Sequence, residues 1–254
     1  MAMSSWATPP LRESPSNKRE AHREVRLATG AKEMTMTNYW LHDDLSFCLI
    51  DGRPIFLDMG SDRYFRLSGN MERIFMNWLG NACAENDTAL LVERKILTDL
   101  SARSRNPCEP VQEPQLSALE PSLSPVPCNA RTLIEVLITV SWTQVQLKTI
   151  GIKRTVERGL KPDSKLAATG SDQAKLLAAA HDFLEARKLV PVGTRCLLDS
   201  LAMAKFLKRR CMRVNVIVGV TSDPFSAHCW VQAGNMVLND ALGNVRIYSP
   251  MRVL

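Results

Sequence analysis

Apolar residues change their spacing several times along the chain, and these changes divide it into segments. Residues 1–38 have few large apolar side chains and are rich in Ser, Pro, Arg and Glu, so we expect a disordered tail. Regular apolar patterns follow, with an interruption at 104–130. The pattern therefore predicts two folded domains, at 39–103 and 131–254.

The first domain is predicted to contain three short antiparallel strands followed by two helices. The dipeptide Asp51-Gly52 separates two apolar runs, which is a strong signal for a β-hairpin. This order of elements predicts a small, winged-helix-like β3α module. The expected elements are strands at 45–50, 54–58 and 63–67 and helices at 70–79 and 88–101, the second capped by Asn86 or Asp87.

Proline dominates the interruption between the two domains. Six prolines stand between Asn106 and Pro127, together with Gln, Glu and Ser. Because proline cannot continue a helix or a central strand, we expect a semi-extended linker over 104–130.

The second domain is predicted to be an α+β fold in which helices pack on an antiparallel sheet. Its first apolar stretch is expected to be helical, although its β-branched residues leave a strand open as the alternative. The expected elements are helices at 131–150, at 171–189 with Ser171 or Asp172 as cap, and after Thr194, then a strand at 214–220 and a hairpin at 227–240.

Composition is that of a globular protein, with 45% hydrophobic and 23% charged residues among 254. No run approaches the roughly 18 to 20 apolar residues that cross a bilayer, and no apolar stretch follows the basic N-terminus, so we expect a cytoplasmic protein without a membrane partner. The seven cysteines are odd in number and form no CxxC pair, which disfavours a disulfide framework and a zinc ribbon. We therefore expect no metal.

The net charge of +6 does not indicate nucleic-acid binding. Part of the excess lies at 205–213, where a helix should end and cations complement its dipole. Aromatic residues, which would stack on bases, make up only 6% of the chain.

Cys196 is the candidate nucleophile. It begins an apolar helix, and a thiol in the first turn of a helix is favoured as the thiolate by the helix dipole. Considered alone, an inert buried cysteine at a helix start is the more common case.

The hairpin supplies the candidate partners of this thiol. If 226–232 and 236–240 pair around a three-residue turn centred on Gly234, His228 lies directly opposite Asp240, within reach of a hydrogen bond. The carboxylate would then orient the imidazole that deprotonates the thiol. A hairpin with a polar outer face is the structural alternative, and spacing alone does not bring Cys196 to His228.

The C-terminal segment combines the candidate residues with specific flanking residues. These are Cys196-Leu-Leu, Ile217-Val-Gly-Val, Pro224-Phe-Ser-Ala-His228-Cys-Trp230-Val, Gly234 and Val237-Leu-Asn-Asp240. With them, the segment resembles the transglutaminase-like leader peptidases of lasso-peptide biosynthesis. The resemblance implies a papain/transglutaminase-like cysteine peptidase with Cys196 as nucleophile, His228 as base and Asp240 as orienting acid. Cys229 stands where we would expect a small residue such as Ala.

The first domain contains Asp51-Gly52, Ile55-Phe-Leu-Asp58 and Asp62-Arg-Tyr-Phe-Arg-Leu67. With these residues it resembles the PqqD-like element that binds leader peptides. The resemblance implies that a leader adds as a strand beside the third strand and lies against the last helix. For Phe65 and Leu67, a simple core position is the alternative. The residues placed near this groove are Tyr64, Phe65, Arg66, Leu67, Leu91 and Lys95.

The two resemblances together imply cleavage of a lasso precursor peptide at its leader/core junction. The partners would be the precursor and an asparagine-synthetase-like cyclase that closes the macrolactam. The chain has no GxxxxGK[ST] motif, so we expect no bound cofactor and assign any ATP requirement to the cyclase. A non-catalytic leader-binding scaffold and an acyl transferase with the same triad remain alternatives. We expect His181, in the middle of an alanine-rich helix, to be structural.

Overall fold

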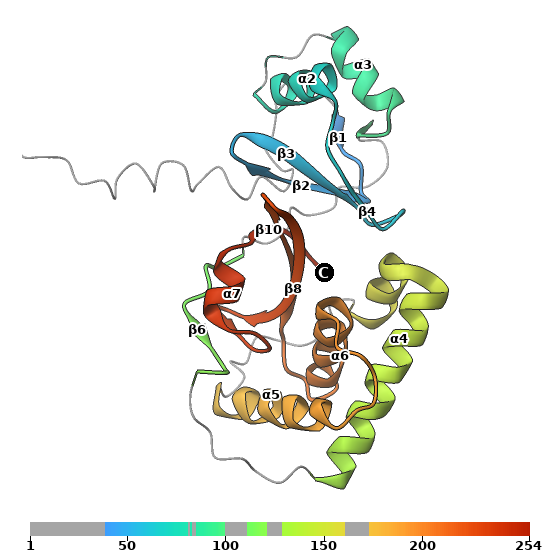
Figure 1. Ribbon diagram of the computed structural model, residues 1–254. Helices are drawn as coiled ribbons and strands as arrows, with labels where there is room; N and C mark the ends of the chain where they lie inside the picture. Colours follow the sequence, from blue (N-terminus) through green and yellow to red (C-terminus); the bar gives the residue numbers. More distant parts are fainter. Residues whose placement is uncertain (1–38, 81, 83–84, 100–110, 121–128, 161–172) are drawn as a thin grey trace, which may run out of the picture.

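The computed structural model describes residues 39–80, 82, 85–99, 111–120, 129–160 and 173–254 (Figure 1). The expected disordered tail and much of the expected linker lie outside these residues, as do the proposed caps Ser171 and Asp172. The described chain forms a small N-terminal module and a larger C-terminal domain, both mixed α and β.

Three strands form the sheet of the N-terminal module, in the order β2-β3-β4. Asp51 and Gly52 both have positive φ, at 52° and 76°, which is the backbone of a two-residue hairpin turn. The predicted hairpin is therefore confirmed. The strands are β2 (Leu45–Ile50), β3 (Arg53–Asp58) and β4 (Arg63–Phe65), followed by helix α2 (Gly69–Leu79).

The predicted second helix of this module is wrong at its C-terminal end. Helix α3 (Glu85–Glu93) begins before the expected caps and stops early, where Lys95 adopts a positive φ of 57°. The next apolar residues form β5 (Leu97–Asp99), antiparallel to β1 (Tyr39–Leu41). The apolar residues on both sides of this turn keep helical spacing in the sequence, which is why a single helix was expected. In the structure, Leu97 enters the same apolar core as Leu91, but from a strand.

Both faces of the β2-β3-β4 sheet are buried. Phenylalanines on one face pack under α2, and the rings of Phe56 and Phe65 stack with centroids 5.0 Å apart. The other face carries Ile55 and Leu57, which share one apolar core with Val218 of the C-terminal domain. The module is thus packed against the C-terminal domain and not merely tethered to it.

Polar contacts reinforce this interface at its edge. The Arg252 guanidinium donates to the main-chain oxygens of Asp43 and Asp44, each at 3.3 Å, and Lys153 Nζ lies 2.5 Å from Asp44 Oδ1. Tyr64 meets Phe225 with ring centroids 5.5 Å apart.

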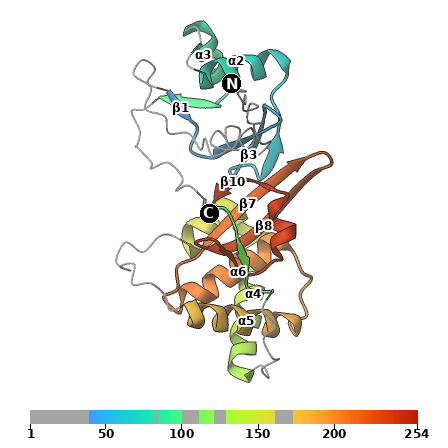
Figure 2. The ribbon, with the colours of Figure 1, turned by 90° about the vertical axis from the view of Figure 1, so that its left-hand side faces the viewer.

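A five-stranded sheet in the order β10-β7-β8-β9-β6 forms the centre of the C-terminal domain. Helices α4, α5 and α6 lie on one side of it, and the short α7 covers the other (Figures 1 and 2). The elements are α4 (Ala130–Gly159), α5 (Gln173–Lys188), α6 (Cys196–Lys208), β7 (Asn215–Ser222), β8 (Phe225–Ala233), β9 (Met236–Val237), α7 (Leu242–Arg246) and β10 (Ser249–Val253).

Helix α4 settles the open choice at 131–150 in favour of a helix. Asn129 caps it by accepting from the Arg131 N–H at 3.0 Å, and Thr139 donates its hydroxyl to the Glu135 carbonyl four residues back. The helix kinks at Gly151, whose φ is 76°.

The linker prediction is only partly right. Strand β6 (Leu116–Ser117) lies within the proline-rich segment and joins the sheet parallel to β9. The Ala118 N–H donates to the Val237 carbonyl at 2.8 Å. Part of the expected linker is therefore an edge strand of the C-terminal domain.

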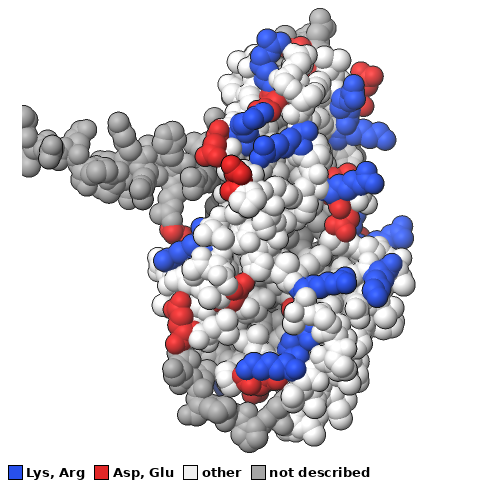
Figure 3. Space-filling model, in the orientation of Figure 1, with Lys and Arg blue, Asp and Glu red and all other residues white. Residues whose placement is uncertain are grey.

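The basic group at the end of α6 is largely paired. Arg210 binds Glu135 at 2.8 Å and its guanidinium lies 3.6 Å from the Phe206 ring centroid, while Arg209 lies 3.5 Å from Glu135. On the face drawn in Figure 3, acidic and basic side chains are interspersed. None of the helices in the described parts of the chain combines the length and apolar character needed to cross a membrane.

Candidate active site

Cys196 occupies the first position of α6, with its side chain exposed to solvent. Its thiol is hydrogen-bonded to His228, and the backbone N–H groups of Cys229 and Leu197 also donate to the sulfur. The bond to His228 is the main reason that the pKa of Cys196 lies below the usual 9.0, although burial acts in the opposite direction. The site therefore favours the nucleophilic thiolate.

His228 lies on β8 between this thiol and Asp240. Its Nε2 atom is 2.5 Å from Asp240 Oδ2, which leaves Nδ1 to exchange a proton with Cys196. The hydrogen bond to Cys196 raises the pKa of His228 above 6.5; burial opposes this, and Asp240 adds to it. Raised imidazole and lowered thiol pKa values together favour a thiolate–imidazolium pair.

Asp240 is fixed by contacts with three parts of the chain. Its Oδ1 accepts from the Ala241 N–H at 2.7 Å and from Asn244 Nδ2 at 3.0 Å. The Ser117 hydroxyl of β6 donates to its main-chain oxygen at 2.7 Å. The carboxylate thus keeps Oδ2 directed at His228.

The predicted hairpin register is wrong by one residue. Ala233 pairs with Met236 and Gln232 with Val237, so the turn has two residues, and β9 ends at Val237. The chain then leaves the ladder, and Asp240 reaches His228 from a loop and not as its cross-strand partner. Because β9 is so short, the edge of β8 is open where Cys196 approaches.

The loop before the nucleophile is held by a buried arginine. The Arg187 guanidinium lies 2.6 Å from Asp199 Oδ1 and donates to the carbonyls of Val190, Val192 and Gly193. Asp199 also accepts from the Arg195 N–H at 3.1 Å. Arg195, and not the preceding Thr194, occupies the N-cap position of α6, and its N–H is satisfied by Asp199.

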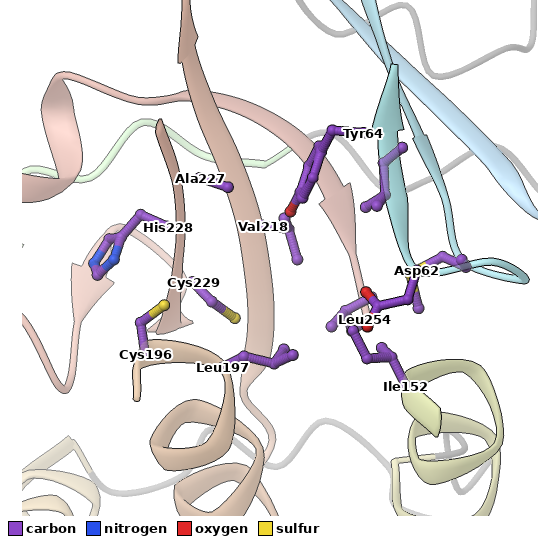
Figure 4. Close-up of a pocket in the computed structure, with 12 residues that line it drawn as sticks. Asp62, Tyr64, Ile152, Cys196, Leu197, Val218, Ala227, His228, Cys229 and Leu254 are labelled. Atoms are coloured by element: carbon purple, nitrogen blue, oxygen red, sulfur yellow. The ribbon is translucent and has the colours of Figure 1, made fainter. Parts of the chain in front are cut away.

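A mostly apolar pocket extends from the thiol toward the N-terminal module. Figure 4 shows Cys196 and His228 at one end of it and Tyr64 and Asp62 across it. Burial raises the pKa of Tyr64 to about 12, so its phenol is neutral at physiological pH. The remaining lining residues are Leu57, Met59, Ile152, Leu197, Val218, Ala227, Cys229 and Leu254.

The structure separates the six residues expected near a leader groove. Tyr64 lines the pocket, and Arg66 and Lys95 are exposed. Phe65 and Leu67 pack against the core of the module, which is the alternative considered for them. Leu91 is 0% exposed in the same core.

Neighbours of His228 complete the site. Cys229 faces the α6 side of the sheet, as alternation predicts, and burial raises its pKa, so its thiol stays neutral. On the other face Trp230 is fully buried, and the Tyr248 ring centroid lies 5.0 Å from that of His228. His181, expected to be structural, lies 3.8 Å from Glu185 on α5.

Sequence reasoning missed several residues of the site. Ser117 and Tyr248 are distant in sequence from the thiol, Arg187 precedes Cys196 on the neighbouring helix, and none of the three belongs to a motif. For Arg187 the available signal was a basic residue in the last turn of a helix, and only burial in the fold distinguishes it from its exposed neighbour Lys188. Among the described residues, no group of three or more His, Cys, Asp or Glu is placed to hold a metal ion.

Residues 137–253, which carry Cys196, His228 and Asp240, match the model of the transglutaminase-like superfamily. A segment of 46 residues is 39% identical to the microcin J25-processing protein McjB of Escherichia coli. This match covers 18% of the chain and 22% of McjB, about a fifth of each. No solved structure matches the chain significantly.

Proposed function

We propose that the protein is a cysteine peptidase that removes the leader from a ribosomally made lasso precursor peptide. The observation that carries this proposal is the contact of an exposed Cys196 thiol with His228, which is itself bound to Asp240. The similarity to a microcin-processing protein supports the class of substrate.

In the proposed reaction, the Cys196 thiolate attacks the carbonyl carbon at the leader/core junction. The C–N bond breaks, the leader remains as a thioester, and Nδ1–H of His228 protonates the departing amine of the core. Water, deprotonated by the same imidazole, then hydrolyses the thioester to a leader carboxylate and restores the thiol. The backbone N–H of Cys196, at the open end of α6, is the candidate donor to the oxyanion.

Leader capture is proposed at the N-terminal module. Strand β4 is at the edge of its sheet, and an extended peptide can add there as a further strand. Arg66 is exposed beside this edge, and Tyr64 reaches from β4 into the pocket beside Cys196. A leader bound along β4 would therefore be led toward the nucleophile, with a mostly apolar pocket for a residue before the junction.

Because the N-terminal module and the C-terminal domain share an apolar core, their relative position is fixed. A leader bound to the module would therefore lie near the thiol without any movement of a flexible linker. The released core would pass to an asparagine-synthetase-like cyclase, which would account for any ATP requirement of the pathway. The cytoplasmic location expected from the sequence fits this pathway and stays a prediction.

The test uses the purified protein and a synthetic lasso precursor peptide. Wild-type protein and Cys211→Ala, which alters an exposed cysteine at the other end of α6, should release a leader with a free carboxylate, detected by mass spectrometry. Cys196→Ala should bind the precursor but release nothing. Leader release by Cys196→Ala would overturn the proposal, and an amide at the leader terminus would indicate acyl transfer instead of hydrolysis.

A further inference from the structure

A chain of hydrogen bonds connects the three elements that carry the proposed triad. The Ser200 hydroxyl donates to the Cys229 carbonyl at 3.0 Å and accepts from Asn239 Nδ2 at 2.9 Å. Asn239 Oδ1 in turn accepts from the Val231 N–H at 2.7 Å. Helix α6, strand β8 and the loop after β9 are thus joined by two side chains.

Each contact lies next to a member of the triad. Ser200 follows Cys196 by one helical turn on α6. Cys229 directly follows the base, and Asn239 directly precedes Asp240. A small displacement of the chain at these contacts would therefore change the distances between Cys196, His228 and Asp240.

Burial shows that the Ser200 hydroxyl is used and not incidental. Ser200 is 0% exposed on a helix whose buried face is otherwise mostly apolar. A buried hydroxyl costs free energy unless both its donor and its acceptor capacity are satisfied. Here both are satisfied, and both partners lie in the segments that hold the base and the acid.

Asn239 also explains how Asp240 leaves the sheet. The Leu238 N–H still donates to the Val231 carbonyl, but the Val231 N–H is taken by the Asn239 side chain instead of a backbone carbonyl. This side chain therefore ends the ladder while keeping the strand edge satisfied. The next residue is free to turn its carboxylate toward His228.

We propose that Ser200 and Asn239 are positioning residues that set the separation of Cys196, His228 and Asp240. This inference rests on the proposed function, because it assumes that Cys196 acts as a nucleophile. Neither residue lines the pocket beside Cys196. They act by holding α6, β8 and the loop after β9 in register, which keeps the thiol within reach of the imidazole.

The test compares the alkylation of two cysteines in the same protein with iodoacetamide at pH 7. Peptide mass spectrometry measures the rate at Cys196 relative to that at the exposed Cys211, at the far end of α6. Ser200→Ala should lower this ratio about five- to tenfold, the loss expected for one hydrogen-bonded link. Thr155→Ala, which removes a buried hydroxyl in α4, should leave it unchanged.

Asn239→Ala and the double variant complete the design. Asn239 is partly exposed, so its replacement tests the inference even if Ser200→Ala does not fold, which urea unfolding would reveal. Asn239→Ala should lower the ratio as Ser200→Ala does. Because both residues belong to one chain of hydrogen bonds, the double variant should lose no more than either single variant.

Two adverse results have different meanings. If folded Ser200→Ala or Asn239→Ala keeps the wild-type ratio, or if the losses add in the double variant, the positioning role is wrong and the peptidase proposal stands. If wild-type Cys196 reacts no faster than Cys211, the nucleophile itself is misassigned and the proposed function fails first.

Discussion

Gly219 lies opposite His228 on β7, and replacing it with alanine should destabilise the protein. A Cβ at this position would lie 2.8 Å and 2.9 Å from two ring carbons of Trp230 and 3.0 Å from Tyr248 Cβ. The Trp230 ring cannot withdraw, because it is fully buried and its Nε1 donates to Gln232 at 3.0 Å. Overpacking of this kind costs about 1–3 kcal/mol.

The sign of the change makes this prediction informative. The φ of Gly219 is not in the left-handed region, so alanine would otherwise stabilise the strand by about 0.4–1 kcal/mol through the unfolded state. The expected net effect is a loss of about 1–2 kcal/mol in the free energy of unfolding. Cys196 should also be alkylated more slowly, since the displaced rings border His228.

Urea unfolding followed by tryptophan fluorescence measures this effect. Gly69→Ala is the matched control, because nothing lies within 4 Å of its added Cβ, and it should be neutral or slightly stabilising. Trp230→Phe removes the ring carbons that the added methyl group would touch, so the losses in Gly219→Ala/Trp230→Phe should be smaller than the sum of the single losses. A stabilised Gly219→Ala would refute the close packing of β7 against these rings.

Other predictions concern the pH dependence of the thiol and the packing of the helices. Alkylation of Cys196 should reach half its maximal rate below pH 9. Asp240→Asn should move this midpoint to higher pH, because without the carboxylate the His228 imidazolium that stabilises the thiolate is less favoured. An unchanged midpoint would contradict the proposed thiolate–imidazolium pair. In urea unfolding, Arg187→Met should lower the free energy of unfolding by about 3 kcal/mol or more, because it leaves the Asp199 carboxylate and buried carbonyls without their partner. Lys188→Met, on the exposed side of α5, is the control and should change it by less than about 0.5 kcal/mol. Burial lowers the pKa of Lys205 from 10.5 to about 8, so a charged, buried lysine destabilises the folded wild type below pH 8. This destabilisation disappears as the pH rises toward 10.5. In urea unfolding, Lys205→Met should therefore raise the free energy of unfolding by about 1 kcal/mol at pH 7 and have no such advantage at pH 10.

Local pattern was enough to place most of the elements in the described part of the chain. The hairpin at Asp51-Gly52, the helix that begins at Cys196 and the strands around His228 follow from turn chemistry and from apolar spacing. These features depend on neighbours a few residues apart, which a sequence displays directly. The three residues of the proposed triad were named from a helix start, a hairpin register and a family resemblance, and the register differs by one residue in the structure.

Predictions from local sequence pattern were wrong where a segment fits a helix, a strand or a linker equally well and only its tertiary contacts decide between them. Leu97 fits a helix as well as a strand, and only pairing with β1 decided between them. Strand β6 has two residues in a proline-rich segment, and only the open edge of β9 makes it a strand.

Residue identity, local spacing and a family resemblance together named the groups that carry the proposed chemistry, because a thiol, an imidazole and a carboxylate are visible in the chain itself. How these groups meet depends on the folded chain. A one-residue change of register and the side chain of Asn239 bring Asp240 to His228, and two sheets packed face to face bring Tyr64 to the thiol. Such contacts join residues from distant parts of the chain, and they depend on volumes and hydrogen bonds that no local pattern encodes.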